Sequence, residues 1–142
     1  MPVRPASDSI DTHQIQQVFS VLDPDMQLHP MSFDGTAFYG RLDEEFGDFN
    51  KHVLISCHSF DEAWTTWEMH PEGDECVILL SGKATMALLK DGEEHTTTLD
   101  TPGQYIVVPR GAWHKALEAE NATMLFITPG QGTQNEQEPP AR

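Results

Sequence analysis

Two short segments of this chain hold the residue types that most often bind metal ions. The first is the run Glu-Met-His-Pro-Glu-Gly-Asp-Glu at residues 68–75, and the second, residues 103–114, ends in a tight Pro-x-Gly turn and a histidine. Imidazole and carboxylate groups are ordinary ligands of iron, manganese, zinc and nickel. The segments therefore predict one bound divalent metal ion (Fe, Mn, Zn or Ni), with four candidate ligands: Glu68, His70, Glu75 and His114.

The spacing of these residues predicts that they converge. Residues two apart on a β-strand point to the same face, so Glu68 and His70 face together on a strand that ends near Pro71. A loop through Gly73 lets the chain reverse and bring Glu75 back beside them. His114 begins a later strand and can complete the set from a neighbouring position.

The elements that must position these residues are short strands. From about residue 52 onward, runs rich in Val, Ile and Thr alternate with glycine-containing turns at the spacing of successive antiparallel strands. Strands are expected at 53–60, 63–70, 75–81, 84–90, 93–99, 104–109 and 113–128, the last as two strands. So many strands without helices between them favour a sandwich or barrel.

The first fifty residues follow a different pattern. Ile15, Val18, Phe19 and Leu22 lie at helical spacing before Pro24, which predicts an amphipathic helix over residues 11–23. A second possible helix covers residues 42–49. We expect residues 1–50 to form an extension with a short helix, 51–129 the barrel, and 130–142 a flexible tail, with the first ten residues also mobile.

Composition limits the classes of function. The chain has 142 residues, the size of one domain, and its 23 acidic and 8 basic residues give a formal net charge of −15. Such a charge repels phosphate backbones and anionic lipid headgroups, so no nucleic-acid or membrane partner is expected. No signal peptide or spanning segment is evident, which predicts a cytoplasmic protein. Cys57 and Cys76 lack paired spacing and are expected to be buried apolar residues rather than ligands or a bridge.

One predicted strand, residues 75–81, is apolar on both faces. Cys76, Ile78 and Leu80 point away from the face that holds Glu75. An apolar outer face needs a cover, either the N-terminal helix or a second subunit. We expect a homodimer through this sheet.

At the two segments the chain resembles the cupin superfamily. His70, Glu75 and Gly82 have the spacing of the second half of the first cupin motif, and the second motif is matched at Gly103, Pro109, Gly111 and His114. The similarity spans roughly residues 60–128. It implies an all-β fold, a double-stranded β-helix or jelly-roll barrel. The chain departs from the pattern at Glu68, which replaces the first motif histidine, and at Glu118, which replaces the terminal asparagine.

The resemblance implies a metal-dependent enzyme of dioxygenase, isomerase or lyase type that acts on a small oxygenated substrate. Glu68 would be a fourth ligand or a catalytic general base. Without Glu68, the remaining His70, Glu75 and His114 form the two-histidine, one-carboxylate triad typical of non-haem Fe(II). The alternative is a non-catalytic cupin module that binds or senses a small molecule.

Several other residues are weaker candidates, and for each of them a packing or surface role is favoured. His52 and His58 are candidate general bases. Trp64 and Trp67 point to opposite faces of a strand, so at most one of them lines the pocket. Tyr105 and Arg110 could contact an anionic substrate at the mouth of the barrel.

Overall fold

The computed structural model describes residues 10–139, and these form nine strands and one short helix. The predicted all-β class with one short helix is confirmed. In the described residues no helix is long and apolar enough to cross a membrane. The elements are β1 (Val18–Leu22), β2 (Leu28–Ser32), α1 (Ala37–Glu45), β3 (Val53–Phe60), β4 (Trp67–Met69), β5 (Glu75–Lys90), β6 (Glu93–Leu99), β7 (Tyr105–Val108), β8 (His114–Thr128) and β9 (Gln134–Glu136).

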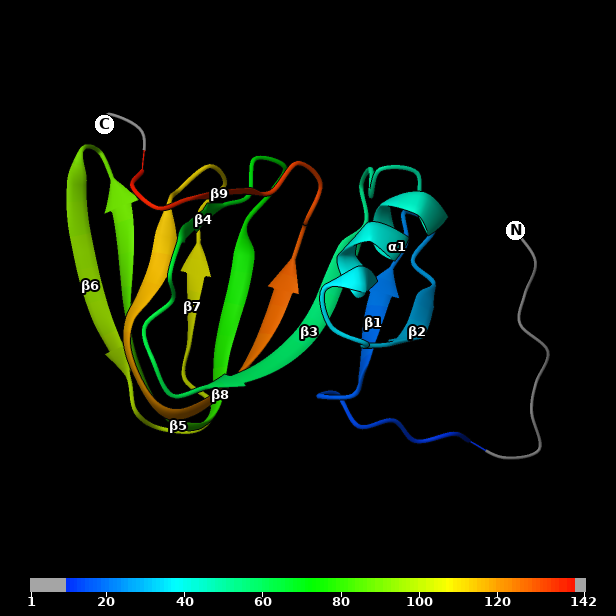
Figure 1. Ribbon diagram of the computed structural model, residues 1–142, viewed down its shortest axis with the longest axis horizontal. Coiled ribbons are helices and arrows are strands. Elements are labelled where there is room, and N and C mark those ends of the chain that lie inside the picture. The colour runs from blue at the N-terminus through cyan, green and yellow to red at the C-terminus, as the bar shows by residue number, and fades with distance from the viewer. Residues whose placement is uncertain (1–9, 140–142) are drawn as a thin grey trace.

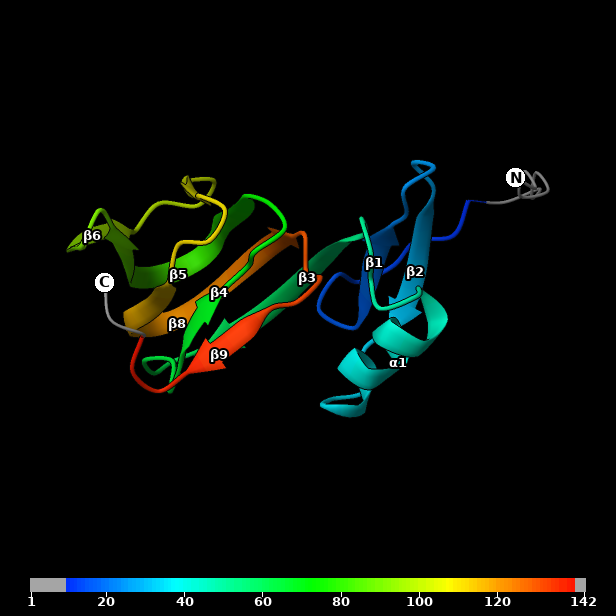
Figure 2. The same cartoon turned by 90° about the horizontal axis from the view of Figure 1, so that it is seen from above.

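All strands belong to one antiparallel sheet that curls on itself (Figure 1). Its path runs β2-β1-β3-β8-β4-β9, and β5 pairs with β8 while holding β6 and β7 along its other edge. Because of this curl, β5 and β6 lie on one side of β8, and β4 and β9 lie on the other (Figure 2). The expected strands 75–81 and 84–90 are the two halves of the single strand β5, and β8 is likewise one strand.

The long strands β5 and β8 pair through their bends, and Gly82 makes this possible. Its φ is +79°, and a Cβ at this position would lie 2.0 Å from the carbonyl oxygen of Asn121. The register between the strands shifts at this point. Only glycine lets the two backbones approach this closely.

The main core lies between the inner faces of the curled sheet. Alternate residues of β5, including Val77 and Leu79, are fully buried against Met124 and Phe126 of β8. A second buried cluster joins the N-terminal elements to β3 through Phe19, Val21, Phe38, Leu42, Phe49 and Leu54.

The predicted helix over residues 11–23 is wrong. This segment contains a turn followed by the strand β1, in which Phe19 and Val21 are buried while their neighbours are partly exposed. The apolar run is short enough to fit both the 3.6-residue repeat of a helix and the two-residue repeat of a strand, and strand pairing decides between them. β1 pairs with β2 on one side and with β3 on the other, so its backbone groups have partners that a helix would not use.

The second predicted helix is present but displaced. α1 spans Ala37–Glu45, whereas residues 42–49 were expected. Gly47, which follows the C-cap residue Phe46, adopts φ +56°, and Asp48 and Phe49 are also left-handed. The backbone reversal at these residues ends the helix.

The terminal segments differ in what the structure describes. Residues 1–9, for which mobility was expected, and residues 140–142 lie outside the described part. Within the expected tail, residues 134–136 form β9, which pairs with β4. Thr133, directly before this strand, contacts His70, so part of this segment has a structural role.

The helix does not cover the outer face of β5. α1 packs on the cluster around β1 and β3 (Figure 1). On β5 and β7 the side chains of Leu80, Tyr105 and Val107 are 39%, 61% and 52% exposed.

Candidate metal centre

Strand pairing brings the two chemistry-bearing segments together. Glu68 in β4 lies directly opposite His114 at the start of β8, and directly opposite residues point to the same face of a sheet. His70 follows β4, and its carbonyl oxygen accepts a 3.0 Å hydrogen bond from the backbone N–H of Gly111, in the turn before His114. Glu75 is the first residue of β5. The four predicted ligands therefore gather at one place.

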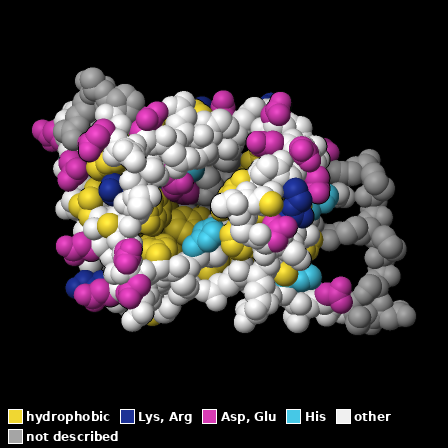
Figure 3. All heavy atoms as spheres, in the orientation of Figure 1, with side chains coloured by type: hydrophobic (Ala, Val, Ile, Leu, Met, Phe, Trp, Pro, Cys, Tyr) yellow, Lys and Arg dark blue, Asp and Glu magenta, His cyan; other side chains and the backbone are white. Residues whose placement is uncertain are grey.

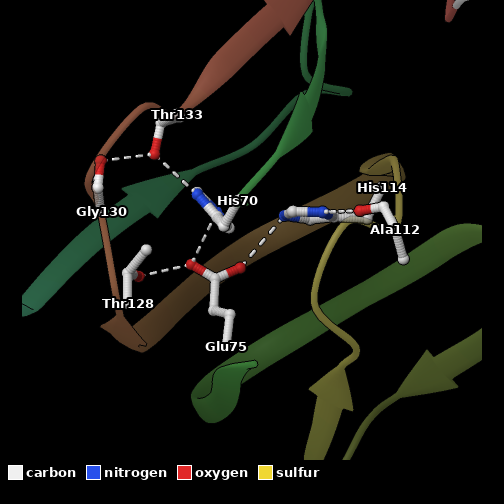
Figure 4. A network of polar contacts seen from close by, with 7 residues as sticks. All are labelled: His70, Glu75, Ala112, His114, Thr128, Gly130 and Thr133. Carbon is white, nitrogen blue, oxygen red and sulfur yellow. Dashed lines mark hydrogen bonds and ion pairs between the residues drawn. The ribbon is translucent and has the colours of Figure 1, made fainter. Parts of the chain in front are cut away.

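The side chains of His70, Glu75 and His114 meet in a buried polar contact (Figure 4). The Nε2 atoms of His114 and His70 lie 3.1 and 3.3 Å from the two carboxylate oxygens of Glu75. All three side chains are at most 6% exposed. Both rings thus point the same nitrogen towards one carboxylate.

The outer nitrogens of the two rings have fixed partners. Nδ1 of His114 lies 3.1 Å from the carbonyl oxygen of Ala112, which can only accept a hydrogen bond. Nδ1 of His70 lies 2.8 Å from the Thr133 hydroxyl, and that hydroxyl donates its own proton to the carbonyl of Gly130. Both Nδ1 atoms must therefore hold the proton, which leaves Nε2 of each neutral ring with a free lone pair facing the site.

The inward-facing atoms have no hydrogen-bond partner. Among the described residues, His70 Nε2, His114 Nε2 and one oxygen of Glu75 are buried without one, although they lie within ion-pair distance of each other. Converging lone pairs repel each other, and burial without a partner is costly. A cation between them, or protonation of the rings, removes this cost, so the residues present fit a metal ion.

Glu68 forms a second candidate set with the same histidines. Ligand atoms of Glu68, His70 and His114 all lie within 4.8 Å of one another. The two sets share both histidines and differ only in the carboxylate. The Glu75 carboxylate accepts a hydrogen bond from the Thr128 hydroxyl. Among the described contacts, no side-chain hydrogen bond holds the Glu68 carboxylate.

Burial and charge move the pKa values of these groups. Burial acts to raise the pKa of Glu75, but the adjacent His114 and His70 rings outweigh it and lower the pKa to about 2. Burial acts to lower the pKa of His114, yet the adjacent Glu75 carboxylate raises it above its usual range. Burial and the charge of Glu75 raise the pKa of Glu68. Without a metal, the proton of the site is therefore held on the histidine side of the pair.

The weaker candidates divide between the cavity and other places. His58 and Trp64 line the cavity beside the site, but His52 and Trp67 do not. Burial lowers the pKa of His58, and its Nε2 lies 3.3 Å from the Tyr39 hydroxyl. Trp67 packs in a separate cluster with Trp113 and Leu117.

The residues expected at the mouth lie elsewhere. Tyr105 is exposed on the outer face, and the Arg110 guanidinium donates to the carbonyl of Glu72 while its backbone N–H donates to Asp74. Glu118 is exposed, because a register shift between β5 and β8 ends the alternation that starts at His114. Cys57 and Cys76 are free thiols, and Cys57 is buried.

Sequence reasoning missed Thr128, Thr133 and Tyr39. Thr128 and Thr133 hold Glu75 and His70, and Tyr39 lines the cavity from α1. Thr128 continues the alternation of buried residues in β8, which is a usable signal. Thr133 and Tyr39 lie in segments whose place depends on tertiary contacts, and their local sequence gives no indication.

Comparisons with known proteins identify the architecture. No family model and no curated protein sequence matches this chain. Among solved structures, the E162A mutant of Bacillus subtilis oxalate decarboxylase is similar over 59% of this chain and 23% of its own, at 20% identity and a TM-score of 0.50.

Two further structures are similar at lower TM-scores. Hydroquinone 1,2-dioxygenase from Sphingomonas sp. TTNP3 shares 19% identity over 54% of this chain and 58% of its own, with a TM-score of 0.46. A cupin-2 domain protein from Shewanella frigidimarina shares 24% identity over 54% of this chain and 70% of its own, with a TM-score of 0.43. The aligned region covers less than two thirds of the first three solved structures. The match to oxalate decarboxylase shows that this chain shares the fold of the matched part of that protein, and Glu68, His70 and His114, all predicted site residues, lie together in it.

Proposed function

We propose that this protein binds one divalent metal ion through His70, Glu75 and His114 and is a metal-dependent enzyme acting on a small oxygenated molecule. The observation that supports the metal is the set of buried, partnerless nitrogen and oxygen atoms that converge on one point. Their outer partners hold both rings in the tautomer that a metal requires. The ion is Fe, Mn, Zn or Ni.

Glu68 has a role beside the three proposed ligands. Its carboxylate lies within 4.8 Å of the ligand atoms of both histidines and lines the cavity. It is either the fourth ligand or the general base that takes a proton from the substrate. A bound divalent ion would polarise a carbonyl or hydroxyl oxygen of the substrate.

Elemental analysis tests the metal directly. The wild-type protein, purified with and without metal supplements, should hold one ion per chain, and His114→Asn should lose it. His95→Asn is the matched control, because this ring is 58% exposed on β6 and outside the cavity. Absence of metal from every supplemented wild-type preparation would refute the proposal.

Glu68→Gln separates the two roles of Glu68. A weaker metal affinity identifies a ligand, whereas full metal content with lost turnover identifies a general base. Turnover is sought as oxygen uptake or isomerisation on a panel of diphenols, thiols and diketones. Stabilisation by one of these molecules without turnover would instead identify a binding or sensing module.

We also propose that the chain forms a homodimer in the cytoplasm. The exposed apolar residues of β5 and β7 form one face, since Ile78 pairs with Tyr105 and Cys76 with Val107. Sedimentation velocity should show a dimer in the wild type and a monomer in Val107→Lys. A monomeric wild type at micromolar concentration would contradict this proposal.

A further inference from the structure

The candidate metal centre lies in the wall of a cavity of about 740 Å³. One side of this cavity comes from β3, β4 and β8, and the other comes from residues of the N-terminal segment, which lies outside the region of cupin similarity. Tyr39, Leu42, Asp43 and Phe49 form that second side. Figure 3 shows the hollow, with hydrophobic and histidine side chains exposed in it. The segment therefore helps to decide what can reach the metal centre.

Large apolar and aromatic side chains make up much of the lining. Phe49 lines the N-terminal side, and Trp64 and Phe126 line the other. The Trp64 ring centroid lies 6.0 Å from the ring of Phe126 and 6.0 Å from that of His114. An aromatic ligand that packs on Trp64 would thus sit beside a metal ligand.

The charged residues of the lining are all acidic. Of the described residues that line the cavity, three are carboxylates, Asp43, Glu68 and Glu75, and none is lysine or arginine. A divalent ion balances the two carboxylates at the centre, and Asp43 leaves the lining negative. An anionic ligand would lose its hydration here without gaining a counter-charge.

The two arginines among the described residues have other partners. The Arg41 guanidinium donates to Asp34 and to the carbonyl of Ser32, and Arg110 donates to the carbonyl of Glu72. Neither residue lines the cavity. Among the described residues, therefore, no arginine or lysine is in place to receive a carboxylate or a phosphate.

We propose that the cavity selects an uncharged aromatic molecule, and that its acidic lining rejects carboxylate and phosphate ligands. The charge balance at the centre, a divalent ion against two carboxylates, rests on the proposed metal site. The acidic lining does not depend on the ion, because in the metal-free protein a proton on the histidine side offsets only part of the charge of the same three carboxylates. The preference for uncharged ligands is thus expected in both forms of the protein.

Two probes of nearly the same shape test the charge preference. 4-Hydroxybenzamide and 4-hydroxybenzoate differ mainly in one negative charge, and their binding is measured by calorimetry at low salt with metal-loaded and with metal-free protein. We expect the amide to bind at least tenfold more tightly in both forms. Equal or tighter binding of the benzoate, or no binding of the amide, would overturn the inference. If the protein takes up no metal, the proposed function fails, while an amide preference in the metal-free form still supports the acidic selection.

Two further comparisons test the cause. Asp43→Lys should reduce the preference for the amide, whereas Glu94→Lys, which makes the same change of net charge on exposed β6 outside the cavity, should leave it. An unchanged preference in Asp43→Lys would overturn the electrostatic basis. The saturated analogue trans-4-hydroxycyclohexanecarboxamide should bind several-fold more weakly than the aromatic amide, and equal affinity would overturn the aromatic part.

Discussion

Replacing Thr133 with valine should weaken metal binding without touching a metal ligand. The Thr133 hydroxyl accepts the Nδ1 proton of His70 because its own proton goes to Gly130. In the metal-free variant, His70 can move its proton to Nε2, where the carboxylate of Glu75 lies 3.3 Å away. Metal binding must return this proton to Nδ1, which then has no acceptor.

The size of the effect follows from that step. Leaving a buried N–H without a partner costs about 1–3 kcal/mol, and at about 1.4 kcal/mol per tenfold this is roughly a 5- to 140-fold loss of affinity. The range agrees with the loss of about 10- to 100-fold typical of changes behind a metal ligand.

The assay is a competition titration of metal-depleted protein with Zn²⁺ or Mn²⁺ against a chromophoric chelator. Thr133→Ser keeps the hydroxyl and should bind metal like the wild type. Thr123→Val removes an exposed hydroxyl that contacts Ser59 far from the site, and it should also have no effect. Wild-type affinity in Thr133→Val would refute the tautomer reasoning.

Three further results are expected from the structure. In the metal-free protein, the pKa of His114 is raised, so its pairing with Glu75 stabilises the fold fully below pH 6.5, the ordinary histidine value. This contribution is lost as the pH rises through the raised pKa. Urea unfolding from pH 5.5 to 8.5 should show this decline in the free energy of unfolding, and His114→Asn should abolish it. Gly82→Ala should prevent stable folding because its Cβ meets the Asn121 backbone, whereas Gly92→Ala, with the same φ of +79° and nothing within 4 Å, should cost only about 1 kcal/mol by the same measurement; similar losses in both would contradict the close-approach argument. Leu79→Ala, at a fully buried position, should lower the free energy of unfolding by about 2–5 kcal/mol, and a loss below about 1 kcal/mol would show that this part of the core is not closely packed.

The strands of the barrel region were predictable because each has a local signal. Runs rich in Val, Ile and Thr between turn glycines predicted β3 and β6 with the bounds that the structure has, and strand parity predicted that Glu68 and His70 face together. The N-terminal segment was not predictable in this way. Its short apolar run fits a helix and a strand equally well, and the partners of β1 that decide the matter are distant in sequence.

For the candidate site, the sequence by itself determined the ligand types and the spacing that brings Glu68, His70, Glu75 and His114 together. Only the tertiary structure decided what surrounds them. The outer partner Thr133 comes from a C-terminal segment, and the acidic residue Asp43 comes from the helix α1. Ligand spacing is a local property of two strands and a turn, whereas hydrogen-bond partners and cavity walls depend on long-range packing that no local pattern encodes.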